Sequence, residues 1–169
     1  MMAGVVIRDL NGCLKRPGEH LDDATITGAV KFALIEQSIG DATDINVETS
    51  MGVVQLAGWV ESEEVKARAG RIAKGVDGVE AVSNRLLISE GKRSAGRVLD
   101  DSILAAKVKF ELSDNDNTSA MSINVEVRNA VVELSGFVDS YDERNAAVDL
   151  VQGMDDVEKV INSMDIAPK

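Results

Sequence analysis

The feature that most constrains the fold of this chain is an internal repeat. Shifting the sequence by 78 residues aligns residues 21–88 with residues 99–166 without a gap, and 26 of the 68 aligned positions are identical. The identities occur in blocks, such as Ile45-Asn46-Val47-Glu48 against Ile123-Asn124-Val125-Glu126. This period is longer than the roughly 20–50 residues of solenoid repeats, so it indicates two tandem domains rather than a stacked array.

The repeat divides the chain into four segments. They are a flexible N-terminal leader over residues 1–20, a first domain over 21–88, a linker over 89–98 and a second domain over 99–169. The linker carries glycine and charged residues, as expected of a connection between domains. Leu10-Asn11-Gly12-Cys13 is similar to the end of a lipoprotein signal, but no apolar run of secretory length precedes it. The sequence therefore favours a mobile leader over lipidation at Cys13.

Each repeat shows the same order of hydrophobic periodicities: helix, strand, strand, helix, strand. In the first repeat the predicted elements are a helix after Asp22-Asp23, strands at 45–49 and 53–60, a helix after Ser62, and a closing strand at 79–88. In the second repeat they fall at 100–112, 123–127, 131–138, 142–152 and 157–166. A short turn with Gly52 separates the first two strands, which is typical of a hairpin.

The predicted fold class follows from how such elements can bury apolar surface. Three strands cannot bury two faces, so both helices should cover one face of the sheet. The chain is therefore expected to be α+β, with two tandem αββαβ units, each a small three-stranded mixed sheet with two helices on one face. A unit of about 70 residues is near the lower size limit for independent stability, so we also expect contact between the units.

Composition and charge exclude several classes of function. The chain has 18 basic and 29 acidic side chains, and a net charge of −11 argues against sequence-independent nucleic-acid binding. A single Cys excludes an intrachain disulfide, and one Cys with one His excludes most zinc sites. No apolar run approaches the about 20 residues of a membrane span. No nucleophile–base pair or phosphate-binding loop is present, so we expect no enzyme, no cofactor and no metal.

Paired aspartates stand at the start of the first predicted helix of each repeat. Asp22-Asp23 and Asp100-Asp101 are expected to cap these helices rather than to act as catalytic carboxylates. The tract Asp114-Asn115-Asp116-Asn117 alternates like a calcium loop, but Ser119 and Val125 occupy the places that need Gly and Glu. A solvated loop is the interpretation that this tract favours.

Four glycines at equivalent positions of the repeats are expected to be structural. Gly58 and Gly136 lie inside predicted strands, where glycine often marks a close approach of another backbone. We expect the second helix of each repeat to pack tightly over them. Gly75 and Gly153 stand where those second helices should end.

The aromatic residues are the candidate interaction sites. Because side chains alternate along a strand, Trp59 and Phe137 should lie on the sheet face opposite the helices. Phe32 and Phe110 lie off the apolar stripe of their helices. The aromatics could dock one unit on the other, bind a partner or lipid surface, or lie against their own neighbours at the core edge. We expect the two units to be docked with at least one of these four residues in the contact.

Both repeats share two motifs, one along the second strand and one from the end of the second helix into the closing strand. They are Val54-Gln55-Leu56-Ala57-Gly58-Trp59-Val60 with Gly75-Val76-Asp77-Gly78-Val79-Glu80-Ala81-Val82-Ser83-Asn84, and Val132-Glu133-Leu134-Ser135-Gly136-Phe137-Val138 with Gly153-Met154-Asp155-Asp156-Val157-Glu158-Lys159-Val160-Ile161-Asn162. These motifs resemble the BON domain, and the resemblance covers about four-fifths of the chain. Two copies with little else are similar to the hyperosmotically inducible periplasmic protein Y family.

The resemblance implies a non-enzymatic protein of the periplasm or cell envelope, linked to osmotic stress. Such proteins bind phospholipid surfaces or protect other envelope proteins. An alternative is a small-ion or osmolyte sensor that works through inter-domain packing, supported only by the acidic surface. If anionic membranes are bound, the first repeat, net −5 against −10 for the second, should dominate with help from Lys92, Arg93 and Arg97.

Overall fold

The structure is a computed structural model that describes residues 7–8, 14–15, 21–39, 44–89 and 91–169. The chain divides into two compact units, with the boundary after Ser89. Ahead of the first helix, β1 (Ile7–Arg8) and β2 (Leu14–Lys15) form a short antiparallel pair. Cys13, the candidate lipidation site, lies outside the described residues.

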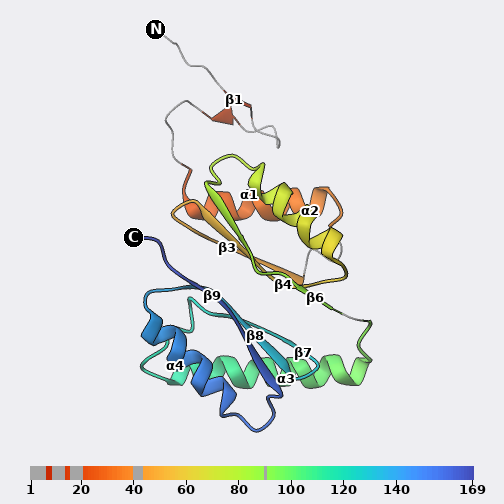
Figure 1. Ribbon diagram of the computed structural model, residues 1–169, viewed down its shortest axis with the longest axis vertical. Coiled ribbons are helices and arrows are strands. Elements are labelled where there is room, and N and C mark those ends of the chain that lie inside the picture. The colour runs from red at the N-terminus through yellow and green to blue at the C-terminus, as the bar shows by residue number, and fades with distance from the viewer. Residues whose placement is uncertain (1–6, 9–13, 16–20, 40–43, 90) are drawn as a thin grey trace. The chain divides into compact units, whose positions relative to one another are not determined.

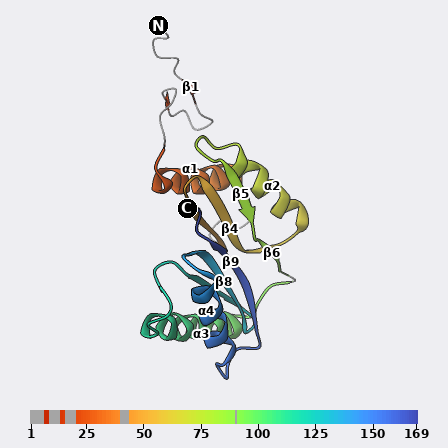
Figure 2. The same ribbon diagram turned by 60° about the vertical axis from the view of Figure 1, so that its left-hand side comes forward.

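The first unit has the expected order of elements. They are α1 (Asp23–Glu36), β3 (Ile45–Ser50), β4 (Val53–Val60), α2 (Glu63–Lys74), β5 (Ala81–Asn84) and β6 (Leu87–Ile88). β3 pairs with β4 in antiparallel fashion, and β5 and β6 pair with β4 in parallel. The single closing strand expected at 79–88 is therefore split into two pieces that follow one another along β4 (Figure 2).

The second unit repeats this arrangement with an unbroken closing strand. Its elements are α3 (Ala95–Asp114), β7 (Asn124–Arg128), β8 (Val131–Val138), α4 (Tyr141–Gln152) and β9 (Lys159–Ile166). The strand order is β7-β8-β9, antiparallel between β7 and β8 and parallel between β8 and β9. The structure thus confirms the α+β class, with a three-stranded mixed sheet repeated in two units.

The core of each unit lies between its helices and one face of its sheet (Figure 1). α1 packs against β3 and α2, and α2 packs against β4 and β5. In the second unit α3 packs against β7 and α4, while α4 packs against β8 and β9. Alternate residues of β4, such as Val54, Leu56 and Val60, point into this core, as period-two alternation predicts. The expected two-helix layer on one face of each sheet is confirmed.

The capping role that the sequence predicted for the paired aspartates is confirmed at Asp22 of the first unit but not in the second unit. Asp22 is the N-cap of α1, and its side chain accepts a hydrogen bond of 2.7 Å from the Thr25 amide. In the second unit, however, α3 begins at Ala95 with Ser94 as its N-cap. Asp100 and Asp101 therefore lie inside the helix, and the prediction that they cap it is wrong. The residues before Asp100 have the composition of a linker, so the sequence places the helix start too late. The N-cap is Ser94, six residues before Asp100, and the helix is longer at this end by about two turns.

Gly58 and Gly136 have a different neighbour from the expected one. Their φ angles are +115° and +111°, a region that L side chains rarely adopt. A Cβ at Gly58 would overlap the carbonyl oxygen of Asp44, and a Cβ at Gly136 would overlap that of Ser122. The close neighbour is thus the backbone that leads into the preceding strand, not the second helix. The expectation of tight helix packing over these glycines is wrong.

Gly75 and Gly153 stand at the C-caps of α2 and α4. Their φ angles are −80° and −78°, so neither adopts the left-handed conformation that makes glycine special at a helix end. Any L residue could adopt this backbone, and the cap amides bond to carbonyls of the preceding turn. The backbone conformation at these two helix ends therefore does not require glycine.

Candidate functional site

The most prominent exposed apolar surface of a single element lies on α3. Leu99, Ile103 and Phe110 are 61%, 50% and 64% exposed, and Ala106 is exposed between them. At 100° per residue these four positions share one face of the helix. We refer to Leu99, Ile103, Ala106 and Phe110 as the α3 stripe. The buried residues of α3, which include Leu104, Val108 and Leu112, lie on the opposite face.

α3 presents this stripe because a buried carboxylate fixes the helix on its sheet. The Asp101 side chain is 3% exposed and accepts hydrogen bonds from the amides of Asn129 and Ala130 at 2.8 and 3.0 Å. These amides form the turn between β7 and β8, where both residues have positive φ. Asp23 binds the equivalent turn of the first unit through the amides of Met51 and Gly52. The second aspartate of each pair therefore holds a helix against a hairpin.

A linker arginine completes the arrangement around Asp101. Arg93 Nη1 donates to Asp101 Oδ2 at 2.8 Å and to the Val127 carbonyl at 3.0 Å. Burial acts to raise the pKa of Asp101, but the Ala130 amide, Arg93 and the Asn129 amide outweigh it and hold that pKa below its ordinary value. The carboxylate therefore stays ionised at neutral pH.

The basic residues of the expected linker belong to the second unit. The boundary between the units falls after Ser89, and Arg93 is bound to the buried Asp101. Arg97 lies in the first turns of α3. That Lys92, Arg93 and Arg97 would assist membrane binding by the first unit stays a prediction, but in the structure their charge is added to the unit that carries the α3 stripe.

Basic side chains flank the α3 stripe on both sides. On the helical wheel Lys107 lies on one side of the stripe and Lys109 on the other. Lys107 is paired with Asp156 at 2.8 Å, and both side chains are more than half exposed. An exposed pair of this kind contributes about 0–1 kcal/mol and is easily opened by a competing partner.

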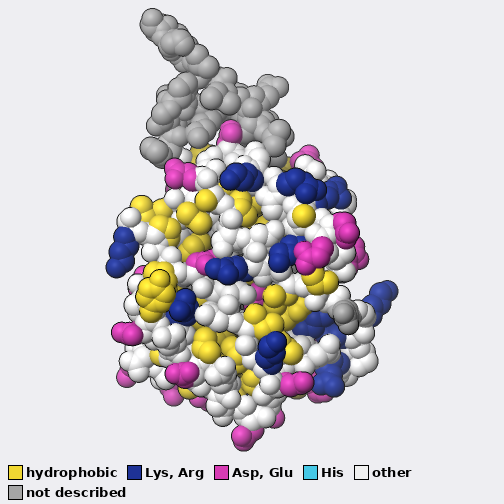
Figure 3. Space-filling view, in the orientation of Figure 1, with side chains coloured by type: hydrophobic (Ala, Val, Ile, Leu, Met, Phe, Trp, Pro, Cys, Tyr) yellow, Lys and Arg dark blue, Asp and Glu magenta, His cyan; other side chains and the backbone are white. Residues whose placement is uncertain are grey.

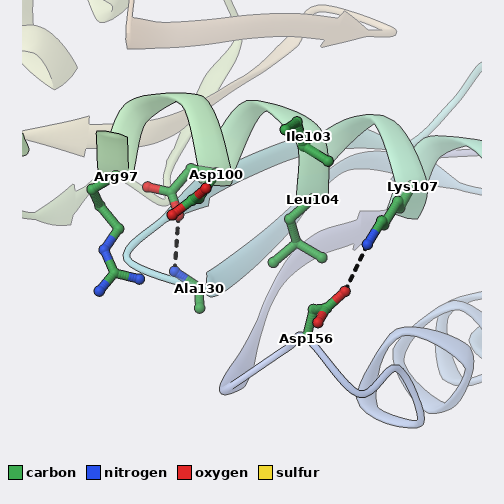
Figure 4. A pocket seen from close by; sticks show the side chains of 8 residues that line it. Arg97, Asp100, Ile103, Leu104, Lys107, Ala130 and Asp156 are labelled. Carbon is green, nitrogen blue, oxygen red and sulfur yellow. Dashed lines mark hydrogen bonds and ion pairs between the residues drawn. The ribbon is translucent and has the colours of Figure 1, made fainter. Parts of the chain in front are cut away.

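A hollow lies beside the stripe in the second unit. It has a volume of about 300 Å³, at the small end of ligand sites. Its lining comes from α3, from the turn before β8 and from the loop before β9, and it consists of Arg97, Asp100, Asp101, Ile103, Leu104, Lys107, Ala130 and Asp156 (Figure 4). Ile103 belongs to both the hollow and the stripe, so the two surfaces are continuous.

The first unit does not repeat this surface. The positions equivalent to the stripe are Leu21, Thr25, Gly28 and Phe32. Phe32 is 53% exposed, but Thr25 and Gly28 interrupt the apolar row. Figure 3 shows apolar, basic and acidic side chains interspersed over the face that it presents. The α3 stripe is thus specific to the second unit rather than a property of the repeat.

The sequence-predicted aromatic candidates fall into two groups. Phe32 and Phe110 point away from the cores of their units and are exposed. Trp59 and Phe137 are half-buried, next to Gly58 and Gly136 on β4 and β8. The expected contact between the units through these residues stays a prediction. Sequence reasoning missed Leu99 as a site residue because it started the helix at residue 100, whereas α3 begins at Ala95 and includes Leu99. Its spacing of four and eleven residues from Ile103 and Phe110 was the available signal.

The structure also bears on metal and membrane-spanning roles. Among the residues that the structure describes, no three His, Cys, Asp or Glu side chains lie together in a way that could hold a metal ion. In the tract after α3, the Asn115 side chain accepts from the Asn117 amide, which is a local turn bond. Within the described ranges, no helix is long and apolar enough to cross a bilayer.

The repeated αββαβ units, with glycine at the crowded strand position of each, define a class of small α+β domains. The BON domain model matches residues 22–90 and 100–168, so the chain belongs to the BON domain family. The resemblance inferred from the strand and helix-end motifs is confirmed.

Two curated relatives span most of the chain. Osmotically-inducible protein Y of Escherichia coli (strain K12) is 33% identical over 156 residues, which cover 92% of this chain and 78% of the relative. The outer membrane lipoprotein DolP of Haemophilus influenzae is 33% identical over 145 residues, which cover 85% of this chain and 74% of that protein. A solved structure of CdsD, a structural protein of the type III secretion system of Chlamydia trachomatis, covers 88% of this chain and 65% of its own, with a TM-score of 0.36 and 16% identity.

Proposed function

We propose that this tandem BON-domain protein is a non-enzymatic protein of the bacterial envelope that binds phospholipid surfaces through the α3 stripe of its second unit. The observation that carries the proposal is the continuous exposed row of Leu99, Ile103 and Phe110 on a helix held rigidly by Asp101. The relatives support the cellular setting, since one is named as an outer membrane lipoprotein and another as osmotically inducible.

The chemistry of the surface suits the boundary between headgroups and acyl chains. An interfacial helix buries an apolar face and keeps basic side chains at headgroup level. On α3 the apolar residues are Leu99, Ile103 and Phe110, and Lys107 and Lys109 flank them. Long lysine side chains can extend to the headgroups while the stripe enters the acyl boundary.

The expected affinity is low, which suits reversible binding. Fully burying an apolar side chain of this size contributes about 1.5–3 kcal/mol, and each of these three is already partly buried. Each therefore adds about 1–1.5 kcal/mol, and the three together correspond to a dissociation constant near the millimolar range of lipid. The acidic surface of the second repeat, with a net charge of −10, opposes binding to strongly anionic membranes.

Vesicle flotation of the full chain at millimolar lipid tests the proposal. The double substitution Ile103→Ser and Phe110→Ser should lower the bound fraction at least about fivefold, since it removes most of the apolar contact. Phe32→Ser is the matched control, because Phe32 is the counterpart of Phe110 in the first unit and is also exposed. It should bind as the wild type does. Equal binding by the wild type and the double variant would contradict the proposal.

A further inference from the structure

The hollow beside the α3 stripe contains charges of both signs. Arg97 and Lys107 supply the positive charges, and Asp100, Asp101 and Asp156 supply the negative ones (Figure 4). The Asp101 carboxylate accepts hydrogen bonds from Arg93 and from the two turn amides, and Lys107 forms an ion pair with Asp156. The part of the chain that the structure describes gives the side chains of Arg97 and Asp100 no hydrogen bond or ion pair. One cation and one anion on the rim are thus available to a ligand.

The position of these two groups limits the ligand chemistry. Arg97 and Asp100 are three residues apart on α3, so their side chains are neighbours on the helix surface. A ligand that carries only negative charge would meet Arg97 but also face Asp100 and Asp156. A ligand with an anion and a cation separated by a short linker can satisfy Arg97 and Asp100 together. The hollow therefore favours a zwitterion.

The lining also indicates which kind of cation is suitable. Quaternary ammonium groups are recognised by cages of aromatic rings, because they cannot donate hydrogen bonds. No aromatic side chain lines this hollow, whereas carboxylates do. A primary ammonium has three N–H donors and suits a carboxylate such as Asp100. An ethanolamine group fits this lining better than a choline group.

We propose that this hollow binds the headgroup of phosphatidylethanolamine in a lipid surface, with the ammonium on Asp100 and the phosphate on Arg97. The inference rests on the proposed function, because it makes the hollow the headgroup site of the membrane-binding face. Ile103, which lines the hollow and is part of the stripe, places the start of the acyl chains next to the headgroup. Arg97 suits the phosphate because its planar guanidinium can donate two parallel hydrogen bonds to phosphate oxygens.

The first unit provides an internal comparison. The positions equivalent to Ile103, Lys107 and Asp156 are Thr25, Ala29 and Gly78. The equivalent of Asp100 is Asp22, whose carboxylate caps α1 by accepting from the Thr25 amide. The repeat therefore conserves the hairpin anchor but not the hollow, and headgroup selectivity should belong to the second unit alone.

Flotation of the full chain with three kinds of vesicle tests the inference. The vesicles contain phosphatidylcholine alone, phosphatidylcholine with phosphatidylethanolamine, or phosphatidylcholine with phosphatidylglycerol. One exposed ion pair changes an equilibrium constant by about two- to fivefold, so the wild type should prefer the ethanolamine vesicles over the choline vesicles by that factor. Asp100→Asn should abolish the preference while binding to choline vesicles is unchanged. Arg97→Gln should lower binding to the ethanolamine vesicles.

Charge-matched controls separate the hollow from general electrostatics. Asp116→Asn and Lys159→Gln make the same charge changes on exposed residues of the second unit that belong neither to the hollow nor to the α3 stripe and its flanks. Both should keep the wild-type preference. Equal binding of the wild type to ethanolamine and choline vesicles, or a preference that survives Asp100→Asn, would overturn the headgroup assignment. Failure to bind any vesicle would instead refute the proposed function, so the two failures are distinguishable.

Discussion

Replacing Gly58 by alanine tests the physical role of the glycine inside the second strand of each unit. Gly58 lies in β4 with φ at +115°, and an added Cβ would overlap the carbonyl oxygen of Asp44. That oxygen belongs to the backbone leading into β3, so it cannot move aside as the end of a flexible side chain could. Relief requires β3 and β4 to separate locally, where Ile45 pairs with Gly58 in the ladder.

The magnitude follows from two costs. A sparsely populated backbone conformation costs about 1–3 kcal/mol. Forcing an extra carbon into a packed site costs about 1–3 kcal/mol more. The expected loss of unfolding free energy is therefore about 2–6 kcal/mol, a large share of the about 5–15 kcal/mol of an ordinary domain. For a unit of this size each kcal/mol lowers the melting temperature by about 4–8 °C, so we expect a fall of at least about 8 °C.

The assay can be confined to the first unit. Trp59 is the sole tryptophan of the chain and follows Gly58 in β4, so its fluorescence reports the unfolding of that unit. Gly28→Ala is the matched control, because Gly28 lies exposed within α1 with open space around its Cα. It should stabilise the unit by about 0.5–1 kcal/mol. A Gly58→Ala melting temperature within a few degrees of the wild type would refute the steric account.

Three further predictions concern the hairpin turns, the buried carboxylate and the relation of the two units. Met51 and Gly52 have φ of +49° and +81° in the β3–β4 turn, so Met51→Asn, which creates the favoured Asn-Gly pair, should raise the first unit's stability by about 0.5–1 kcal/mol in thermal melts. Because the folded pKa of Asp101 lies below its unfolded value, its contribution is complete above about pH 4 and is lost as the pH falls through the folded pKa. Asp101→Asn should therefore lower the free energy of unfolding by about 1–3 kcal/mol at pH 7. In urea titrations the variant should also lose less stability than the wild type as the pH falls below about 4. An unchanged pH dependence in the variant would contradict the assignment. We also expect the two units to be docked, so ¹⁵N relaxation should give one correlation time, and Trp59→Ser should shorten it; independent tumbling of the wild-type units would contradict this.

The repeat and its periodicity were sufficient to predict the order of elements and the layer arrangement. The alternation of apolar residues along 53–60 and their helical spacing after Ser62 indicate which side of each element is buried. Burial of one face of each element in turn determines the fold class. Local sequence could not show that α3 begins at Ala95. The segment around Gly96 and Arg97 is typical of a linker by composition, whereas the helix start depends on the Ser94 cap and on Arg93 bound to a distant carboxylate.

Long-range contacts also explain the other differences between sequence and structure. The role of Asp101 depends on amides of a turn about 30 positions later in the chain, which no local pattern reveals. Gly58 was identified as a close-approach glycine, but its partner, the Asp44 carbonyl, follows only from the strand register. Part of the candidate site could be predicted from the sequence, because Phe110 and Ile103 lie off the apolar stripe that faces the core. The hollow could not be predicted, since Asp156 joins its lining from the loop before β9.

The central claim is that the α3 stripe enters the lipid surface, and depth-dependent fluorescence quenching tests it most directly. A double variant with Trp59→Phe and Phe110→Trp moves the only tryptophan onto the stripe, and the first change is mild because the second repeat has Phe137 at the equivalent position. With vesicles containing brominated acyl chains, the account predicts quenching of this variant that rises with lipid concentration, while Trp59 of the wild type stays unquenched. No quenching of the double variant at millimolar lipid, or equal quenching in both proteins, would contradict the account.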